Sequence, residues 1–287
     1  MSLAAHAQPF FLEAGGGERF CLYHAPAGDC RGAFVYVHPF GDEMNRTRRM
    51  AALGARALAR AGYGVLQIDL AGCGDSSGEF GEARWQGWKD DLTLARAWLA
   101  GRLGRPAGVW GLRLGALLAL DHAADLADTA DEPRLLLWQP VLAGATYLTQ
   151  LLRLRMAGDL VGTNAGNGGG ADSPQALRAL LQAGSAVEIG GYLLAPELAA
   201  ALDRLDAARL APAAAVDWFE VVAAPDRPAP PAAQRVAAAW QDKRKDAGKD
   251  VCLHTVAGPS FWASQEITEC PALVEATVAA LVESAHA

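Results

Sequence analysis

Short apolar runs alternate with longer amphipathic segments along the first half of the chain. Four of these runs predict strands, at 33–37, 64–69, 107–110 and 134–138. The segments between them have the periodicity of amphipathic helices and cover 46–61, 85–102 and 113–124. Strands that alternate with helices in this way form a parallel sheet with helices on both faces. The pattern therefore predicts an α/β domain whose functional residues lie at the carboxyl ends of the strands.

The alternation stops at residue 139 and resumes at about residue 210. Within this stretch, 148–156 fit a helix, whereas 162–172 are rich in glycine and asparagine and are expected to be mobile. Beyond it, the remaining strands and helices are predicted at 216–222, 231–246, 251–256 and 265–284. We therefore predict a core of residues 1–138 and 210–287 with an insertion at 139–209. The insertion follows the fourth strand, so it is either a lid over the strand ends or a surface excursion.

The amino-acid composition argues against nucleic-acid binding and against a membrane span. The chain has 287 residues, of which 52% are hydrophobic, which is ample for a large core. Its formal net charge of −7 and the lack of a basic stripe argue against nucleic acid as a partner. No apolar stretch reaches the roughly 18 residues of a membrane span, and no signal peptide is recognisable. The expected location is therefore the cytoplasm.

The cysteines and histidines predict neither a disulfide framework nor a metal centre. The five cysteines are scattered and form no Cys-x-x-Cys pair, which suits free thiols in a reducing compartment. The six histidines are separated from one another and from the cysteines, so no metal site is expected. No cofactor motif was found, and none is predicted.

A Gly-x-nucleophile-x-Gly frame follows the third predicted strand, in the run Val109 to Gly115. In α/β hydrolases this frame is the sharp strand-to-helix turn that presents the catalytic serine. Here the nucleophile position is Arg113. A guanidinium stays protonated near neutral pH and cannot attack a carbonyl carbon.

Further motifs make nearly the whole chain resemble the α/β-hydrolase fold. The residues His38-Pro39-Phe40-Gly41 resemble the loop that supplies one oxyanion-hole amide. The run 69–78 resembles the family's Asp-x-x-Gly-x-Gly-x-Ser-x-Gly loop, and 111–115 occupy the nucleophile elbow. The resemblance implies that Asp226, after the strand at 216–222, is the acid of the triad.

The third member of a triad is missing from the sequence. Where the family has a histidine after the last strand, this chain has Phe261 and Trp262, which cannot act as bases. His254 lies inside the strand and is expected to be a core residue. Ser76 lies in a literal Gly-x-Ser-x-Gly match, but without the strand and helix of an elbow, so we interpret it as a loop-stabilising residue. Ordinary Ser-His-Asp hydrolysis is therefore not supported.

Three runs narrow the resemblance further. They are His-Pro-Phe-x-x-Glu-x-Asn-x-x-Arg from His38 to Arg48, Gly-Leu-Arg-Leu-Gly at 111–115, and Gly-x-x-Phe-Trp-x-x-Gln-Glu-Ile at 258–267. Together they resemble the second hydrolase class associated with exosortase A, found beside bacterial exopolysaccharide and PEP-CTERM sorting systems. The resemblance implies a bacterial cytoplasmic protein linked to envelope or exopolysaccharide assembly.

Arg113 has two interpretations that the sequence leaves open. A guanidinium above a helix N-terminus favours anions, so Arg113, the amide of Leu114 and the loop from His38 through Phe40 to Glu43 would bind a carboxylate, phosphate or sulfate. Alternatively, Arg113 pairs with an internal acid and closes the former active site. The candidate acids are Asp42, Glu43, Asp226 and Glu266.

Catalysis by other groups is a third possibility. Glu43 would be a general base on water, helped by Asp226 and Glu266, with Arg113 stabilising negative charge. Phe261 and Trp262 would wall the pocket or bind an acyl or sugar group. Two functions follow: a hydrolase-like enzyme, or its remnant, acting on an ester, amide or acyl group of an anionic metabolite, or a non-catalytic binding or scaffold protein centred on Arg113.

Overall fold

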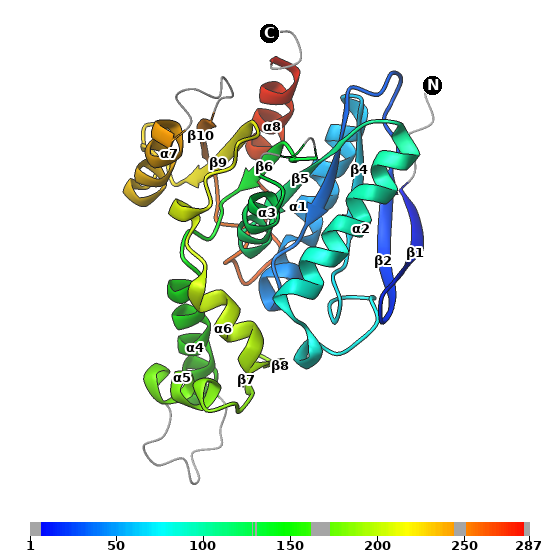
Figure 1. Cartoon of the computed structure of the whole chain (residues 1–287). Helices are drawn as coiled ribbons and strands as arrows, with labels where there is room; N and C mark the ends of the chain where they lie inside the picture. Colours follow the sequence, from blue (N-terminus) through cyan, green and yellow to red (C-terminus); the bar gives the residue numbers. More distant parts are fainter. Residues whose placement is uncertain (1–6, 128, 130, 162–172, 244–250, 284–287) are drawn as a thin grey trace.

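An eight-stranded sheet in the order β1-β2-β4-β3-β5-β6-β9-β10 runs through the protein (Figure 1). The computed structural model describes residues 7–127, 129, 131–161, 173–243 and 251–283. The strands are β1 Gln8–Ala14, β2 Gly17–His24, β3 Gly32–Val37, β4 Tyr63–Ile68, β5 Ala107–Leu112, β6 Leu135–Trp138, β9 Val216–Val222 and β10 Val251–Ala257. The six strands from β4 to β10 in this order are parallel. The sheet thus has the mostly parallel architecture of the predicted α/β-hydrolase fold.

Helices cover both faces of the sheet (Figure 1). One face packs against α1 Gly41–Arg60 and α8 Pro271–Glu283. The other packs against α2 Trp85–Leu103, α3 Leu114–Asp125 and α7 Pro231–Lys243. Packing under α1 is tight, because a Cβ on Gly54 would lie 2.5 Å from the ring of Trp110. The central strands are buried on both sides, which explains their continuous apolar runs.

The insertion elements gather at one end of the sheet, below the ends of β5 and β6 (Figure 1). They are α4 Gly144–Val161, α5 Pro174–Gln182, β7 Val187–Ile189, β8 Tyr192–Leu194, α6 Pro196–Arg204 and the 3-10 turn η2 Ala207–Arg209. β8 packs against a second 3-10 turn, η1 Phe80–Glu82, which belongs to the core. The stretch 162–172, expected to be mobile, lies outside the described residues. The described elements of the insertion lie beside the turn between β5 and α3.

Several boundaries differ from the sequence prediction. The strands β1 and β2 were not predicted; they form an antiparallel hairpin at the sheet edge, and β2 pairs antiparallel with β4. The helix α1 begins at Gly41 rather than at residue 46, with Asp42 and Glu43 in its first turn, where negative charge is favourable. The helix α8 begins at Pro271 rather than at 265, because proline suits the first helical position and disfavours helical backbone in the residue before it.

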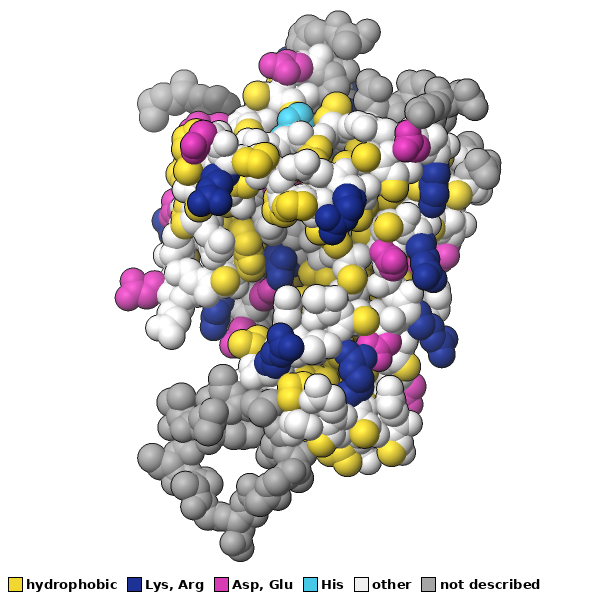
Figure 2. Space-filling view, turned by 90° about the vertical axis from the view of Figure 1, so that its left-hand side faces the viewer, with side chains coloured by type: hydrophobic (Ala, Val, Ile, Leu, Met, Phe, Trp, Pro, Cys, Tyr) yellow, Lys and Arg dark blue, Asp and Glu magenta, His cyan; other side chains and the backbone are white. Residues whose placement is uncertain are grey.

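The surface shows no dominant charge on the face drawn in Figure 2. Lys and Arg side chains there are interspersed with Asp and Glu side chains and with single apolar groups. Among the described residues, no helix is both long and apolar enough to cross a bilayer.

Candidate functional site

The elbow between β5 and α3 holds Arg113 in an unusual backbone conformation. Its φ of 54° and ψ of −116° lie where a residue with a side chain is strained. The turn needs glycine on either side, since a Cβ on Gly115 would lie 2.2 Å from the Val37 carbonyl oxygen and one on Gly111 would lie 2.4 Å from Ala116 Cα. The nucleophile-elbow geometry is therefore retained with arginine at its tip.

The guanidinium of Arg113 is paired with Glu43. Arg113 Nε and Nη2 donate to Glu43 Oε1 at 3.2 and 3.1 Å, and the side chains are only 16% and 20% exposed. The hydroxyl of Tyr147, from α4, donates to Glu43 Oε2 at 3.2 Å. The ring of Trp262 lies 5.5 Å from the guanidinium carbon and covers it. Of the two interpretations that the sequence left open, the structure thus shows the paired arginine.

Burial governs the ionisation of Tyr147. Its hydroxyl is removed from solvent and faces the Glu43 carboxylate, and both effects raise its pKa well above the usual value. Tyr147 therefore stays protonated and donates to Glu43. No sequence motif pointed to this residue, because its partner lies 104 positions away along the chain.

The other candidate acids do not reach Arg113. Asp42 pairs with Arg46 at 3.5 Å and is exposed. Asp226 and Glu266 are exposed as well, and neither makes a hydrogen bond or ion pair with Arg113 in the described part of the chain. The acid position that the family resemblance implied at Asp226 is therefore not part of this cluster.

A buried acid, Glu220, lies within the strand β9 itself. Glu220 in β9 is 2% exposed and accepts hydrogen bonds from Trp218 Nε1 and Gln139 Nε2, both at 2.8 Å. Burial raises the pKa of Glu220 to about 7, against the lowering effects of these hydrogen bonds and of the Arg113 charge. The sequence signal for this buried acid is a carboxylate inside the apolar run 216–222.

Gln139 contacts both Arg113 and Glu220, and so connects Glu220 to Glu43. Its carbonyl oxygen accepts from Arg113 Nη1 at 3.5 Å, and its Oε1 accepts from the Val221 amide at 2.7 Å. Its φ of 44° is also in the left-handed region. A continuous series of contacts therefore runs from Glu220 through Gln139 and Arg113 to Glu43.

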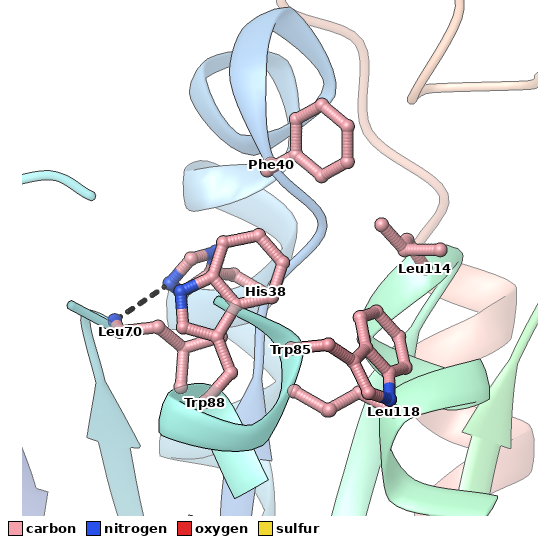
Figure 3. Close-up of a pocket in the computed structure, with 8 residues that line it drawn as sticks. His38, Phe40, Leu70, Trp85, Trp88, Leu114 and Leu118 are labelled. Atoms are coloured by element: carbon pink, nitrogen blue, oxygen red, sulfur yellow. Dashed lines mark hydrogen bonds between the residues drawn. The ribbon is translucent and has the colours of Figure 1, made fainter. Parts of the chain in front are cut away.

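In the loop that resembles an oxyanion loop, both ring nitrogens of His38 are hydrogen-bonded to backbone groups. Its Nε2 accepts the Leu70 amide proton at 3.1 Å (Figure 3). Its Nδ1 therefore carries the hydrogen and donates to the Pro39 carbonyl oxygen at 2.6 Å. Burial lowers the pKa of His38 and keeps the ring neutral. With Phe40 and Leu114 it borders a cavity of about 10 Å³. That space is no larger than one water molecule.

A larger pocket lies between the insertion and the core. Its volume is about 410 Å³, within the range of small-molecule sites. Its lining includes Phe40, Glu43 and Trp262 from the core. The insertion and η1 supply most of the rest: Phe80, Tyr147, Gln150, Leu151, Leu154, Ile189, Gly190, Tyr192 and Leu194.

Phe261 does not line this pocket. It is fully buried and packs edge-on against Trp138, with ring centroids 6.5 Å apart. The predicted role of Phe261 as a pocket wall is therefore incorrect, whereas Trp262 reaches the pocket. Both rings belong to the buried cluster under α8 and lie edge-on to each other, with centroids 5.2 Å apart, but it is Trp262 that lies over the Arg113 guanidinium.

Residues 28–183, more than half of the chain, match the family described as serine aminopeptidase, S33. The chain belongs to the S33 family of α/β hydrolases.

Solved structures share the fold of this S33 chain. Est1E from Butyrivibrio proteoclasticus with bound ferulic acid has a TM-score of 0.65 and 15% identity, covering 97% of this chain and 100% of that one. A thermostable carboxyl esterase from Bacillus coagulans has a TM-score of 0.62 and 15% identity, with coverage of 98% and 99%. At this level of identity the likeness concerns the fold.

A human relative matches a shorter region. Protein ABHD12B of Homo sapiens is 29% identical over 113 residues, which are 39% of this chain. The matched region spans only 30% of the length of that relative.

Other nucleophile candidates of this S33 chain are structural. Ser76 Oγ accepts from the Phe20 amide at 2.9 Å and donates to the Asp69 carbonyl oxygen at 2.5 Å, so it stabilises its loop. Burial raises the pKa of the Cys73 thiol to about 12. Around the pocket, no three metal-ligating side chains of the described residues come together; Asp217, Cys252 and His254 do so elsewhere.

Proposed function

We propose that this S33-family chain binds a ligand with an acyl or aryl group in the pocket between insertion and core, without hydrolysing it through an acyl-enzyme. The observation that carries the proposal is the Arg113–Glu43 pair at the nucleophile elbow. An arginine whose donors are directed to a carboxylate takes the place of a nucleophile. The hydrolase fold then serves as a binding scaffold.

Glu43 is poorly placed as a replacement base. Both of its oxygens already accept hydrogen bonds, one from Arg113 and one from Tyr147. The carboxylate is thus held as the ion-pair partner of Arg113 and the hydrogen-bond acceptor of Tyr147. His38 is no substitute, because both of its ring nitrogens are engaged by backbone groups. These contacts favour binding over catalysis.

The chemistry of the pocket lining indicates the class of ligand. The walls are mostly aromatic and aliphatic, which favours an acyl chain, an aryl ring or the apolar face of a sugar. The charged groups at its border are paired with one another, Glu43 with Arg113 and Asp42 with Arg46. A neutral or amphipathic ligand therefore suits the pocket better than a small multivalent anion.

The biological setting is part of the same proposal. The motifs that begin at His38, Gly111 and Gly258 resemble the second hydrolase class associated with exosortase A. On this basis we place the protein in the bacterial cytoplasm, in exopolysaccharide assembly or PEP-CTERM protein sorting. An acyl- or sugar-containing intermediate of envelope assembly would have the chemistry that the pocket favours.

A fluorescence titration with N-phenyl-1-naphthylamine, a neutral aryl probe, tests binding. We expect saturable binding that Leu154→Glu weakens by about tenfold, because a charge at the pocket rim opposes apolar contact. Leu180→Glu is the matched control, since Leu180 is an exposed leucine of α5 outside the pocket lining. Equal affinities for the two variants would contradict the proposed site.

Turnover of short p-nitrophenyl esters tests catalysis. We expect none from the wild type, and none from Arg113→Ser, because restoring the hydroxyl does not restore a base beside it. Wild-type turnover that disappears in both Glu43→Gln and Arg113→Ala would overturn the binding proposal. It would favour the alternative, a hydrolase that uses Glu43.

A further inference from the structure

Three side chains of metal-ligand type meet at the open edge of the sheet. Cys252 and His254 lie two residues apart on β10, so their side chains share one face of the strand. Asp217 on β9 is in register with Cys252. The Sγ atom, an imidazole nitrogen and a carboxylate oxygen of the three residues all lie within 4.8 Å of one another.

We propose that Asp217, Cys252 and His254 form a binding site for Zn²⁺ or a divalent transition metal with the same ligand preference. Thiolate, imidazole and carboxylate are the three donor types that zinc takes in proteins. The sequence argued against a metal centre because the histidines and cysteines are dispersed along the chain. Strand pairing supplies the third donor, which sequence spacing does not reveal.

The positions of the donor atoms suit a tetrahedral ion. His254 Nε2 and Asp217 Oδ1 are hydrogen-bonded at 3.4 Å, a contact that a bound ion would replace. Two donors that each lie about 2.0–2.1 Å from a tetrahedral zinc are roughly 3.3–3.4 Å apart. These two atoms are thus already spaced to share one ion.

Neighbouring groups hold two of the donors in place. Arg134 Nη2 donates to Asp217 Oδ2 at 2.7 Å, which orients the carboxylate with Oδ1 toward His254. The His254 ring stacks on Phe219, with centroids 4.5 Å apart and planes 14° from parallel. A hydrogen bond to the ligating carboxylate, as from Arg134, is typical of metal sites. The positive charge of Arg134 opposes a cation, and the carboxylate and thiolate offset it.

Access and position separate this site from the pocket. Cys252 is exposed and His254 is partly exposed, so an ion can enter from solvent. Asp217 and Cys252 are the second residues of their parallel strands, whereas Arg113 follows the carboxyl end of β5. The two sites therefore lie toward opposite ends of the sheet. Three protein donors leave one position of a tetrahedral ion for water or an external ligand.

Titration of the tag-free full chain with Co²⁺ tests the proposal. We expect one ion per chain, with the visible absorption of tetrahedral cobalt and a thiolate-to-cobalt charge-transfer band. The Cys252 thiol loses its proton to solvent when it binds. Cys252→Ser should remove the charge-transfer band, and Cys252→Ser and His254→Gln should each lower Zn²⁺ affinity by about tenfold or more in calorimetric titrations.

Cys30→Ser is the matched control, because Cys30 is a free cysteine that contacts Gly32 at the start of β3, and β5 and β6 separate β3 from β9 in the sheet. It should bind as the wild type does. Circular dichroism in the presence of a chelator checks that each variant is folded, and unchanged N-phenyl-1-naphthylamine binding separates this result from that of the pocket. Failure of the folded wild type to bind one equivalent would overturn the proposal. So would Zn²⁺ affinities left unchanged by both ligand substitutions.

Discussion

The Arg113–Glu43 pair should make a measurable contribution to stability, and a double-mutant cycle isolates it. Glu43→Gln removes the charge but keeps an oxygen that can accept from Arg113 and an amide that can face Tyr147. Arg113→Met removes the donors and keeps a long side chain under Trp262. The backbone strain at residue 113 is common to arginine and methionine, so it cancels from the comparison.

The magnitude follows from distance and burial. Two unit charges about 4 Å apart attract by roughly 4 kcal/mol at an effective dielectric constant of 20. Both side chains are about four-fifths buried, so removal from water cancels part of this attraction. We therefore expect a coupling free energy of about 1–3 kcal/mol. Arg113→Met should destabilise more than Glu43→Gln, because it leaves a carboxylate with Tyr147 as its remaining side-chain donor.

Urea unfolding at pH 7, followed by tryptophan fluorescence, measures the four free energies of unfolding. Asp42→Asn with Arg46→Met provides a control cycle on the neighbouring exposed pair, for which about 0–1 kcal/mol is expected. A coupling below about 0.5 kcal/mol at Arg113–Glu43, no larger than that of the control, would contradict a stabilising role for the pair. The Arg113–Glu43 pair would then contribute no more to stability than an exposed ion pair does.

Two further predictions concern the surroundings of the elbow. The pKa of Glu220 is raised to about 7 in the folded protein, so the folded state binds more protons than the unfolded state between the ordinary value of 4.5 and 7. The contribution of Glu220 therefore lowers the free energy of unfolding by on the order of 1–3 kcal/mol as the pH rises from 5 to 8. Urea unfolding should show a flatter pH dependence in Glu220→Gln. Gly115→Ala should lower the free energy of unfolding by at least about 3 kcal/mol or prevent folding, because its Cβ would meet the Val37 carbonyl oxygen. Gly101→Ala, in open space on α2, should instead raise it by roughly 0.5–1 kcal/mol. Thermal melts of the two variants measure the difference.

The sequence predicted the features that depend on local pattern. The central parallel strands and their helices follow from apolar runs and amphipathic segments, and the elbow follows from Gly111 and Gly115, which the close packing requires. The β1–β2 hairpin was not predicted, although its alternating strands and glycine turn were present. Glu43 was among the candidate partners of Arg113, since strand-end loops converge on an elbow.

The side-chain network depended on contacts that sequence spacing cannot supply. Tyr147 reaches Glu43 from an insertion helix, and Gln139 turns with a positive φ to contact both Arg113 and Glu220. Asp226 was expected by analogy with the triad order, whereas the buried acid lies six residues earlier, inside the strand. Burial in three dimensions, not order along the chain, determines which acid interacts with Arg113.

The network also connects the core with the insertion. It begins at Glu220 in β9, next to the edge strand β10, passes through Gln139, Arg113 and Glu43, and ends with Tyr147 on α4. Glu43 and Tyr147 lie in the lining of the pocket, so this network forms part of the pocket's inner surface. A serine at the elbow could not make these contacts, because a hydroxyl is too short to reach Glu43 and Gln139 together. Arginine at position 113 therefore does more than remove a nucleophile: it joins the insertion to the sheet at the place where a ligand would lie.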